Sequence, residues 1–265
     1  MMQLPYHLID AFTDQPFSGN PAAVFKLSAP LSDTLMQAIA AEMNLSETAF
    51  VYQGEADLTL RWFTPVAEVD LCGHATLAAA FVLFSAFSKH FSGQVCFQTR
   101  SGPLVCDQTS EGITLDFPAT PPQPQAVESD VINALGLTTV RYFGRSTFDY
   151  LIEVESESIL VGLEPDFNQL QRKATRGFIV TAKSQEAGLD FVSRFFAPKY
   201  GVNEDPVTGS AHCCLAPFWS AKTRRSTLSA AQRSKRGGHL HLQMAGDRVL
   251  ISGRAVRVAE GMLTI

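Results

Sequence analysis

The sequence predicts an α+β protein made of two similar halves, each with short strands around one apolar helix. The first observation is an internal repeat: RWFTP at residues 61–65 and RFFAP at residues 194–198 are each followed by a polar turn, a glycine and an apolar helix. The second is the length of 265 residues, which exceeds that of a usual single domain. We therefore expect two domains, residues 1–118 and 119–265, with the last strand able to return to the first domain.

Composition favours a well-buried globular enzyme over a disordered or nucleic-acid-binding chain, because hydrophobic residues make up 46% and charged residues 18%. The net charge of −5 argues against polyanionic partners. The five cysteines are odd in number and fit no paired metal spacing, which indicates free thiols in a reducing compartment.

The N-terminal residues 1–7 have no basic region followed by an apolar run, so no signal peptide is expected and a cytoplasmic location is predicted. The apolar stretch at residues 75–87 is shorter than the roughly 20 residues that a membrane-spanning helix needs. We therefore expect neither a nucleic acid nor a membrane as a partner.

In the first half, a strand at residues 6–12 leads through a loop rich in Gly, Pro and Asn into a strand at residues 22–25. Ser32 and Asp33 then cap a helix whose apolar positions recur at helical spacing. The later elements are a core helix beginning at Gly73 and strands at residues 48–52, 58–63, 95–99, 104–108 and 113–117. Glu47 is thus placed at a junction between two elements.

Residues 118–124 contain four prolines and have the clearest linker composition in the chain. The second half has a core helix beginning at Gly209, in which Pro217 should produce a kink or an end because proline removes a backbone donor. Residues 222–238 are predicted as a basic, Ser-rich connection. The remaining predictions are a polar helix near residues 166–173 and strands at residues 141–143, 150–154, 177–181, 190–196, 240–244, 249–252 and 255–258.

Two residues of the first half are candidates for proton transfer. Glu47 is flanked by apolar residues, where desolvation raises a carboxyl pKa towards neutral and lets the group accept and return a proton. A capping role for Glu47 is slightly favoured by spacing alone. His74 follows Gly73 at a helix start, where the helix dipole favours a neutral ring. A capping or core histidine is an equally good interpretation.

The segment EDPVTGS at residues 204–210 places a carboxylate in a tight proline turn before a helix start, which has free backbone N–H groups that bind anions. Asp205 could transfer a proton, although an Asp before Pro more often closes a turn. Ser210 could hold a carboxylate or be an ordinary first-turn residue. Cys72, at the first helix start, could act as a thiolate base. An inert buried thiol is the safer interpretation, because the matching residue of the second half is Thr208.

The chain resembles the phenazine-biosynthesis PhzF-like isomerases, within the diaminopimelate epimerase-like fold. The motifs that carry this resemblance are DAFT at 10–13, FSGNP at 17–21, SET at 46–48, RWFT at 61–64, CGHAT at 72–76, SG at 101–102 and EDPVTGSA at 204–211. The resemblance implies two domains, each a curved, barrel-like mixed sheet wrapped around a central helix, with the active site in the cleft between them. It also implies a homodimer and a reaction that needs no cofactor and no metal.

The resemblance further implies roles for single residues. Glu47 corresponds to the glutamate that shuttles a proton in an allylic isomerisation, and His74 and Asp205 correspond to its proton-transfer helpers. The substrate-binding positions that it implies are Asn20, Gly73, Gly209 and Ser210. The chain departs from the phenazine enzymes at Cys72, where those enzymes have a small residue and the epimerases have one of two catalytic cysteines.

Three functions follow as hypotheses. The first is a cofactor-independent isomerase that moves a proton within a small carboxylated metabolite, with Glu47 as the acid/base. The second is an amino-acid racemase or epimerase that uses the single thiol of Cys72. The third is a non-catalytic small-molecule-binding or regulatory protein.

Overall fold

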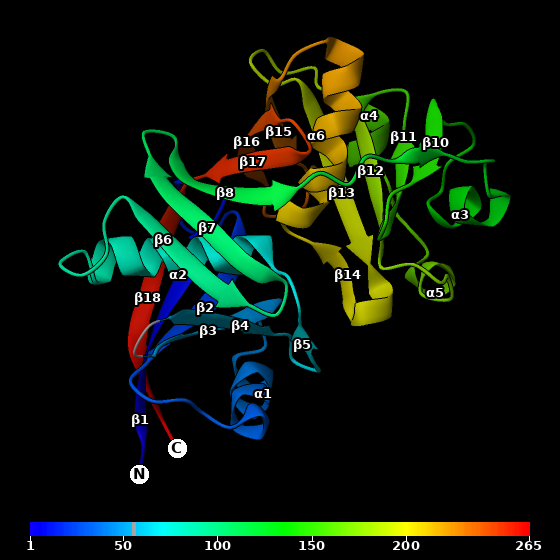
Figure 1. Cartoon of the computed structure of the whole chain (residues 1–265). Helices are drawn as coiled ribbons and strands as arrows, with labels where there is room; N and C mark the ends of the chain where they lie inside the picture. Colours follow the sequence, from blue (N-terminus) through cyan, green and yellow to red (C-terminus); the bar gives the residue numbers. More distant parts are fainter. Residues whose placement is uncertain (55–56) are drawn as a thin grey trace. The chain divides into compact units, whose positions relative to one another are not determined.

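The computed structural model describes residues 1–54 and 57–265, and the chain divides into two compact units (Figure 1). Unit 1 comprises Met1–Phe117 and Leu250–Ile265, and unit 2 comprises Pro118–Val249. The division falls at the start of the proline-rich segment 118–124. Unit 1 is therefore built from both ends of the chain, and unit 2 from its middle.

Unit 1 is a mixed sheet with two helices. Its elements along the chain are β1 (Gln3–Ala11), β2 (Asn20–Leu27), α1 (Asp33–Met43), β3 (Glu47–Gln53), β4 (Leu58–Phe63), β5 (Glu68–Val69), α2 (Gly73–Ala86), β6 (Gln94–Thr99), β7 (Gly102–Thr109), β8 (Gly112–Pro118), most of β17 (Arg248–Gly253), and β18 (Ala255–Thr264). The β2–β3 and β4–β6 pairs are parallel, whereas β1 pairs antiparallel with both β2 and β18.

Unit 2 has the same alternation of parallel and antiparallel pairs. Its elements are β9 (Gln123–Pro124), α3 (Ser129–Ala134), β10 (Tyr142–Arg145), β11 (Asp149–Glu153), α4 (Glu157–Val161), α5 (Phe167–Leu170), β12 (Gly177–Lys183), β13 (Phe191–Ala197), the 3-10 helix η1 (Pro198–Tyr200), β14 (Val202–Asp205), α6 (Gly209–Thr223), β15 (Thr227–Gln232) and β16 (Gly238–Ala245). The β11–β12 and β13–β15 pairs are parallel, and β12–β13 is antiparallel, as β3–β4 is in unit 1.

The arginines of the two repeated motifs make the same side-chain contacts. On β4, Arg61 donates from Nε and Nη2 to the carboxylate of Glu68 on β5, both at 2.7 Å. On β13, Arg194 donates from the same two atoms to Glu204 on β14, at 2.7 and 2.9 Å. Each guanidinium also lies over the phenylalanine two positions further along its strand. Such bidentate pairs have strict geometry, so the two halves share a structural unit as well as a sequence pattern.

Each unit has one helix that is buried on nearly all faces. In unit 1, α2 packs against β1, β2, β3 and β7, and only Phe81, Ser85 and Ala86 of its residues are not buried. In unit 2, α6 contacts β15 and β16 and buries nine of its 15 residues. A helix that is apolar all round is stable only inside a protein, and Figure 1 shows α2 in cyan and α6 in gold among the strands of their units. The predicted α+β class is confirmed.

Most predicted elements are present within a few residues of their expected ends. Ser32 caps α1 as expected, with its hydroxyl oxygen accepting from the backbone N–H of Leu35 at 3.3 Å. Glu47 is the first residue of β3, at the predicted junction. The polar helix near residues 166–173 shrinks to the short α5, and α3, α4, β5, β9 and β14 were not predicted.

Pro217 was predicted to kink or end the core helix of unit 2. It does not end this helix, because α6 continues to Thr223. A proline at this position leaves the carbonyl of Cys213, four residues earlier, without its helical N–H donor. The backbone N–H of Thr120 donates to that carbonyl at 2.9 Å instead. The proline-rich linker thus supplies the hydrogen bond that the helix lacks.

The prediction of a basic, Ser-rich connection over residues 222–238 is also wrong, because the strand β15 lies within these residues. Leu228, Ala230, Ala231 and Gln232 are buried in this strand. The strand pairs with both β13 and β16, so long-range pairing outweighs the low strand propensity of a short Ser/Ala-rich segment.

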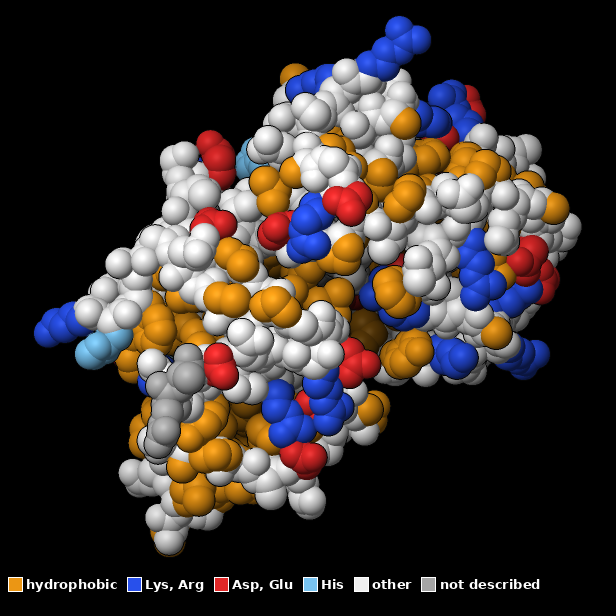
Figure 2. Space-filling view, in the orientation of Figure 1, with side chains coloured by type: hydrophobic (Ala, Val, Ile, Leu, Met, Phe, Trp, Pro, Cys, Tyr) orange, Lys and Arg blue, Asp and Glu red, His pale blue; other side chains and the backbone are white. Residues whose placement is uncertain are grey.

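In the part of the chain that the structure describes, no helix combines the length and the apolar character needed to cross a membrane. On the face shown in Figure 2, Lys and Arg side chains are distributed over several places, and some of them lie beside Asp and Glu side chains. Arg61 illustrates this arrangement, since it is paired with both Asp33 and Glu68.

Candidate functional site

The first candidate site residues meet at the start of α2. Asn20 and Glu47 are the first residues of β2 and β3, and these parallel strands begin at the same edge, with Ala22 opposite Glu47. His74 lies in the first turn of α2, directly after Gly73. The Asn20 amide nitrogen is 3.1 Å from Nδ1 of His74, and Nε2 of the same ring is 3.4 Å from Oε2 of Glu47. The sequence-predicted residues of unit 1 are thus brought together.

The His74 ring is held neutral by its surroundings. Burial lowers its pKa from 6.5 to about 3, because a charged ring in this apolar position loses its hydration. With the Asn20 amide donating to Nδ1, the remaining proton of the neutral ring is on Nε2, the atom that faces Glu47. A ring in this tautomer can share a proton with the Glu47 carboxyl group, and the side chain of Glu47 is 19% exposed, so small molecules can reach it.

Cys72 is the N-cap residue of α2 and has a buried side chain. Its Sγ lies 3.6 Å from Nδ1 of His74. The matching N-cap residue of α6 is Thr208, as the repeat predicted. Unit 1 therefore has a thiol–imidazole contact that unit 2 does not repeat.

The second group of candidate residues meets at the start of α6. The Thr208 hydroxyl donates to Oδ2 of Asp205, which closes the turn through Pro206. The side chain of Asp205 is buried, with 9% of its surface exposed. Gly209 and Ser210 are the first two residues of α6, where backbone N–H groups have no helical partner. The structure thus also brings the predicted residues of unit 2 together.

Gln232 was not among the predicted residues, and it holds this turn in place. It is fully buried on β15, with its Oε1 accepting from the backbone N–H of Thr208 at 2.9 Å. Its Nε2 donates to the backbone carbonyl of Asp205 at 2.7 Å. The amide therefore ties the two ends of the turn to each other and fixes the direction of the Asp205 side chain.

Arg176 is a second residue that the sequence did not single out. Its Nε donates to Oδ1 of Asp149 at 2.9 Å, its Nη2 donates to Oδ2, and Asp149 is 1% exposed. Its Nη1 donates to Oγ of Ser210 at 3.0 Å. Because the hydroxyl oxygen accepts from the guanidinium, the Ser210 hydroxyl proton is left to donate elsewhere, which suits an anionic oxygen.

The repeat offers a signal that could have located Arg176. Thr48 of β3 lies opposite Phe63 of β4, and Phe178 of β12 lies opposite Phe196 of β13. Because Phe63 and Phe196 are matching residues of the repeat, Thr48 matches Phe178. Glu47 thus corresponds to Gly177, and a side chain at Gly177 would meet the Phe195 ring at 2.3 Å. The charged residue in unit 2 is Arg176, one position before Gly177.

His212 is a further buried histidine of α6. Its Nδ1 is 2.8 Å from the carbonyl of Thr208, and its ring stacks on Phe191 with centroids 6.0 Å apart. Burial lowers its pKa from 6.5 to about 4. The ring is thus a neutral part of the unit 2 core.

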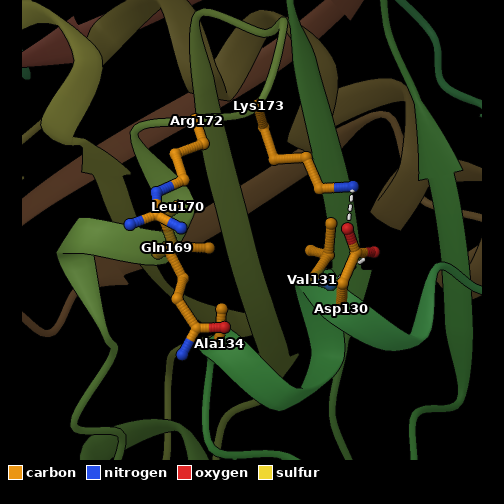
Figure 3. A pocket seen from close by; sticks show the side chains of 7 residues that line it. All are labelled: Asp130, Val131, Ala134, Gln169, Leu170, Arg172 and Lys173. Atoms are coloured by element: carbon orange, nitrogen blue, oxygen red, sulfur yellow. Dashed lines mark hydrogen bonds and ion pairs between the residues drawn. The ribbon is translucent and has the colours of Figure 1, made fainter.

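A cavity of about 330 Å³ lies elsewhere in unit 2, beside α3 and α5 (Figure 3). It is lined by Asp130, Val131, Ala134, Gln169, Leu170, Arg172 and Lys173. Lys173 is already paired with Asp130 and with Glu128. None of the candidate residues lines this cavity, so chemistry rather than cavity size identifies the candidate site.

One group of described residues has the donor atoms and spacing of a metal site. One ligand atom each from Glu47, Cys72 and His74 lie within 4.8 Å of one another. Carboxylate, thiolate and imidazole are the three ligand types that proteins offer to zinc.

Comparison with known proteins gives consistent results. The family model of the phenazine biosynthesis-like proteins (PhzC-PhzF) matches residues 9–261. A protein of Halalkalibacterium halodurans named as an uncharacterized isomerase is 48% identical over 268 residues, which cover 100% of both chains.

Solved structures agree with this result. The crystal structure of a PhzF-family phenazine biosynthesis protein from Enterococcus faecalis has a TM-score of 0.94 and 42% identity, and covers 100% of both chains. A predicted epimerase from Pseudomonas aeruginosa shares the fold, with a TM-score of 0.77 at 20% identity over 99% of both chains. The predicted diaminopimelate epimerase-like fold is confirmed.

Proposed function

Because the chain belongs to the phenazine biosynthesis-like family and is an isomerase, we propose that it moves a proton within a small carboxylated metabolite, with Glu47 as the acid/base. In this reaction the Glu47 carboxylate removes a proton from one carbon and returns it to another carbon of the same substrate. The substrate gains and loses no atoms or electrons, so the proposed reaction needs no oxidant or reductant.

The observation that carries this proposal is the contact between Glu47 and His74. The ring nitrogen that carries the proton lies 3.4 Å from the carboxylate oxygen, a distance that can shorten when a substrate binds. The low pKa of His74 keeps the ring neutral, so it can exchange a proton with Glu47 without a lasting ion pair. Asn20 fixes which ring nitrogen faces Glu47.

We assign carboxylate binding to the helix starts. Backbone N–H groups at Gly73, Gly209 and Ser210 are of the kind that bind anions. The hydrogen bond from Arg176 to Ser210 supports this assignment, because it orients the serine hydroxyl as a donor. Asp205 is proposed to assist proton transfer.

The test is solvent isotope exchange. The protein is incubated in D₂O with a panel of dihydro-hydroxy-aromatic acids, amino acids and a metabolite extract, and mass spectrometry detects deuterium in any compound. We expect Glu47→Gln to lower exchange at least about 10²-fold, since this is the usual contribution of a general acid/base. Glu42→Gln, an exposed glutamate of α1, is the matched control and should keep full exchange. Unchanged exchange in Glu47→Gln would remove this residue from the mechanism.

A second candidate function is a one-thiol racemase or epimerase. It is favoured by the 3.6 Å contact between Cys72 Sγ and His74 Nδ1. Here Cys72→Ala would abolish exchange while Glu47→Gln retained it. Iodoacetamide would inactivate the protein, and a bound substrate analogue would slow the inactivation. Absence of exchange with every compound, together with ligand-dependent thermal shifts, would instead indicate a binding protein.

A homodimer in the cytoplasm is part of the same proposal. Free thiols at all five cysteines support a reducing compartment. Light scattering of the purified protein would measure twice the 28.9 kDa chain mass for a dimer.

A further inference from the structure

The first turn of α2 concentrates three metal ligands of different chemistry in a small volume. Cys72 and His74 are 6% and 4% exposed, and Glu47 provides the more exposed side of the group. Their ligand atoms lie within 4.8 Å of one another, and Nε2 of His74 lies 3.4 Å from Oε2 of Glu47.

The distance between Nε2 and Oε2 matches the spacing of two ligands around a tetrahedral zinc ion. With Zn–N and Zn–O distances of roughly 2.0–2.1 Å, two such ligands stand roughly 3.3 Å apart. Nε2 of His74 and Oε2 of Glu47 are separated by 3.4 Å. A Zn–S distance of about 2.3 Å places the sulfur roughly 3.5 Å from each of the other ligands. Cys72 Sγ now lies 3.6 Å from Nδ1, the other nitrogen of the ring, so it has to turn from Nδ1 towards the side of Nε2 and Glu47 to join the same ion.

The second observation is the state of Nε2 of His74. This atom is buried, and Oε2 of Glu47, at 3.4 Å, lies beyond the ordinary hydrogen-bond distance. The other ring nitrogen already has a polar partner in Asn20. Metal-bound histidines usually donate their second ring N–H to a carbonyl or carboxylate oxygen. Rotation of the Asn20 amide by half a turn presents its oxygen to Nδ1, so a suitable partner is in place.

From this arrangement we propose that Glu47, Cys72 and His74 bind a thiophilic divalent cation, with Zn²⁺ as the ion that fits, and that the bound ion blocks the isomerase. On binding, the Cys72 thiol releases its proton to solvent and its sulfur bonds to the ion. Glu47 and His74 then hold the metal with the same atoms that the proposed reaction uses for the proton. The metal is thus an inhibitor that competes with the proton, and it is not a cofactor.

The test measures metal binding without substrate, so it stands apart from the success of the proposed isomerisation. The chelator-treated protein carries Cys96→Ser, which removes an exposed thiol. Zn²⁺ is titrated in competition with a fluorescent zinc indicator, and Co²⁺ is used as a coloured substitute. We expect one ion per chain with a dissociation constant below about 10 µM, and a thiolate-to-cobalt charge-transfer band in the near ultraviolet.

Variants then assign the ligands. Cys72→Ser should remove the charge-transfer band and weaken Zn²⁺ binding at least about tenfold, and Glu47→Gln should weaken binding similarly while keeping the band. Cys213→Ser, which removes a buried thiol near the start of α6, is the matched control and should change neither. Circular dichroism checks that each variant is folded.

The rate of alkylation gives an independent measurement of whether the metal ion occupies the Cys72 thiol. Zn²⁺ should slow the reaction of iodoacetamide at Cys72 at least about tenfold, as measured by mass spectrometry of the peptide that contains it. A charge-transfer band that survives Cys72→Ser, equal weakening in Cys213→Ser, or no binding up to about 100 µM Zn²⁺ would overturn the proposal.

Discussion

His74 and His212 are buried residues that titrate at different pH values in the folded and unfolded chain. Both have folded pKa values well below 6.5, at about 3 and about 4, because burial penalises the charged ring. As the pH falls through 6.5, the unfolded chain takes up the proton first, so the free energy of unfolding decreases. The stability contributed by the two neutral rings is present above pH 6.5 and is lost towards pH 3–4.

His212 gives the simpler measurement, because its ring contacts the Thr208 carbonyl and Phe191. Between pH 7 and pH 5, protonation of this histidine in the unfolded chain should lower the free energy of unfolding by about 2 kcal/mol. In His212→Asn, whose amide can still donate to Thr208, urea denaturation at the two pH values should show a decrease smaller by that amount. An unchanged pH dependence would mean that His212 is protonated at a similar pH in both states.

Arg176 can be tested through the two partners that it joins. Arg176→Ala leaves Asp149 buried without its cation, and we expect a loss of about 3–5 kcal/mol in unfolding free energy. Asp149→Asn combined with Arg176→Gln removes both charges and should recover part of this loss. Ser210→Ala keeps the ion pair, so it should change substrate binding with little effect on urea denaturation. Equal losses in Arg176→Ala and Ser210→Ala would contradict this division of roles.

At the scale of elements, the two bidentate arginine pairs occupy matching positions but differ in what surrounds them. Arg194 also donates from Nη1 to the carbonyls of Leu160, Val161 and Leu163, at 3.2, 3.2 and 2.9 Å. Arg61 instead donates to the exposed carboxylate of Asp33. One arginine thus satisfies the carbonyls at the end of a helix, and the other forms a surface ion pair.

We therefore expect Arg194→Lys to cost roughly 1–3 kcal/mol of unfolding free energy, since lysine cannot satisfy all of these carbonyls. Arg61→Lys should cost less than Arg194→Lys, because both substitutions lose a bidentate pair but the further partner of Arg61 is the exposed Asp33. Urea denaturation of the two variants makes the comparison. A larger effect at Arg61 would show that the surface pair matters more than the helix end.

The hydrogen bond from Thr120 to Cys213 allows a similar test. Thr120→Pro removes the N–H that replaces the donor missing at Pro217, and should cost about 1–3 kcal/mol. In a Pro217→Ala background, where the helix regains its own donor, the loss should be smaller. Thr120→Ala keeps the N–H and serves as the control. The prediction fails if Thr120→Pro costs the same in both backgrounds.

Some of these elements could be predicted from the sequence, and others could not. Local signals located α1 through its Ser32 cap and α2 and α6 through their uniform apolarity, because those signals lie within the element itself. The strand β15 was missed because its stability comes from partners far away in the sequence. Motifs found Glu47 and His74, whereas the 3.4 Å contact between them depends on how β3 and α2 pack. Gln232 and Arg176 were missed because they act through turns formed by other segments.

At the scale of the whole molecule, the two ends of the chain lie together in unit 1. The backbone N–H of Met2 donates to the carbonyl of Ile265 at 2.6 Å, and that of Ile265 donates to Met2 at 2.9 Å. Between them, β1 and β18 pair along their length, with one register shift at Leu8 and Ile9. The first and last strands of the chain are thus paired within the sheet of unit 1.

Circular permutation should therefore be tolerated. A short Gly/Ser linker joins the ends, and new termini are opened between Ala187 and Gly188, in an exposed turn. We expect the permuted chain to keep its far-ultraviolet circular dichroism and a melting temperature within about 5 °C of the parent. Deletion of residues 255–265 should instead remove the partner of β1 and give an unfolded or aggregated unit 1. A stable, fully folded deletion variant would show that β18 is dispensable.

The pairing of β1 with β18 also has a consequence for the order in which the chain folds on the ribosome. Domains generally fold as units during synthesis, with the N-terminal one first. Here β1 is synthesised before unit 2, whereas its partner strand is complete only when residues 255–264 have been made. Unit 2, at residues 118–249, is complete before that point. We therefore expect unit 2 to be able to fold before unit 1, because the sheet of unit 1 is incomplete until β18 has been made.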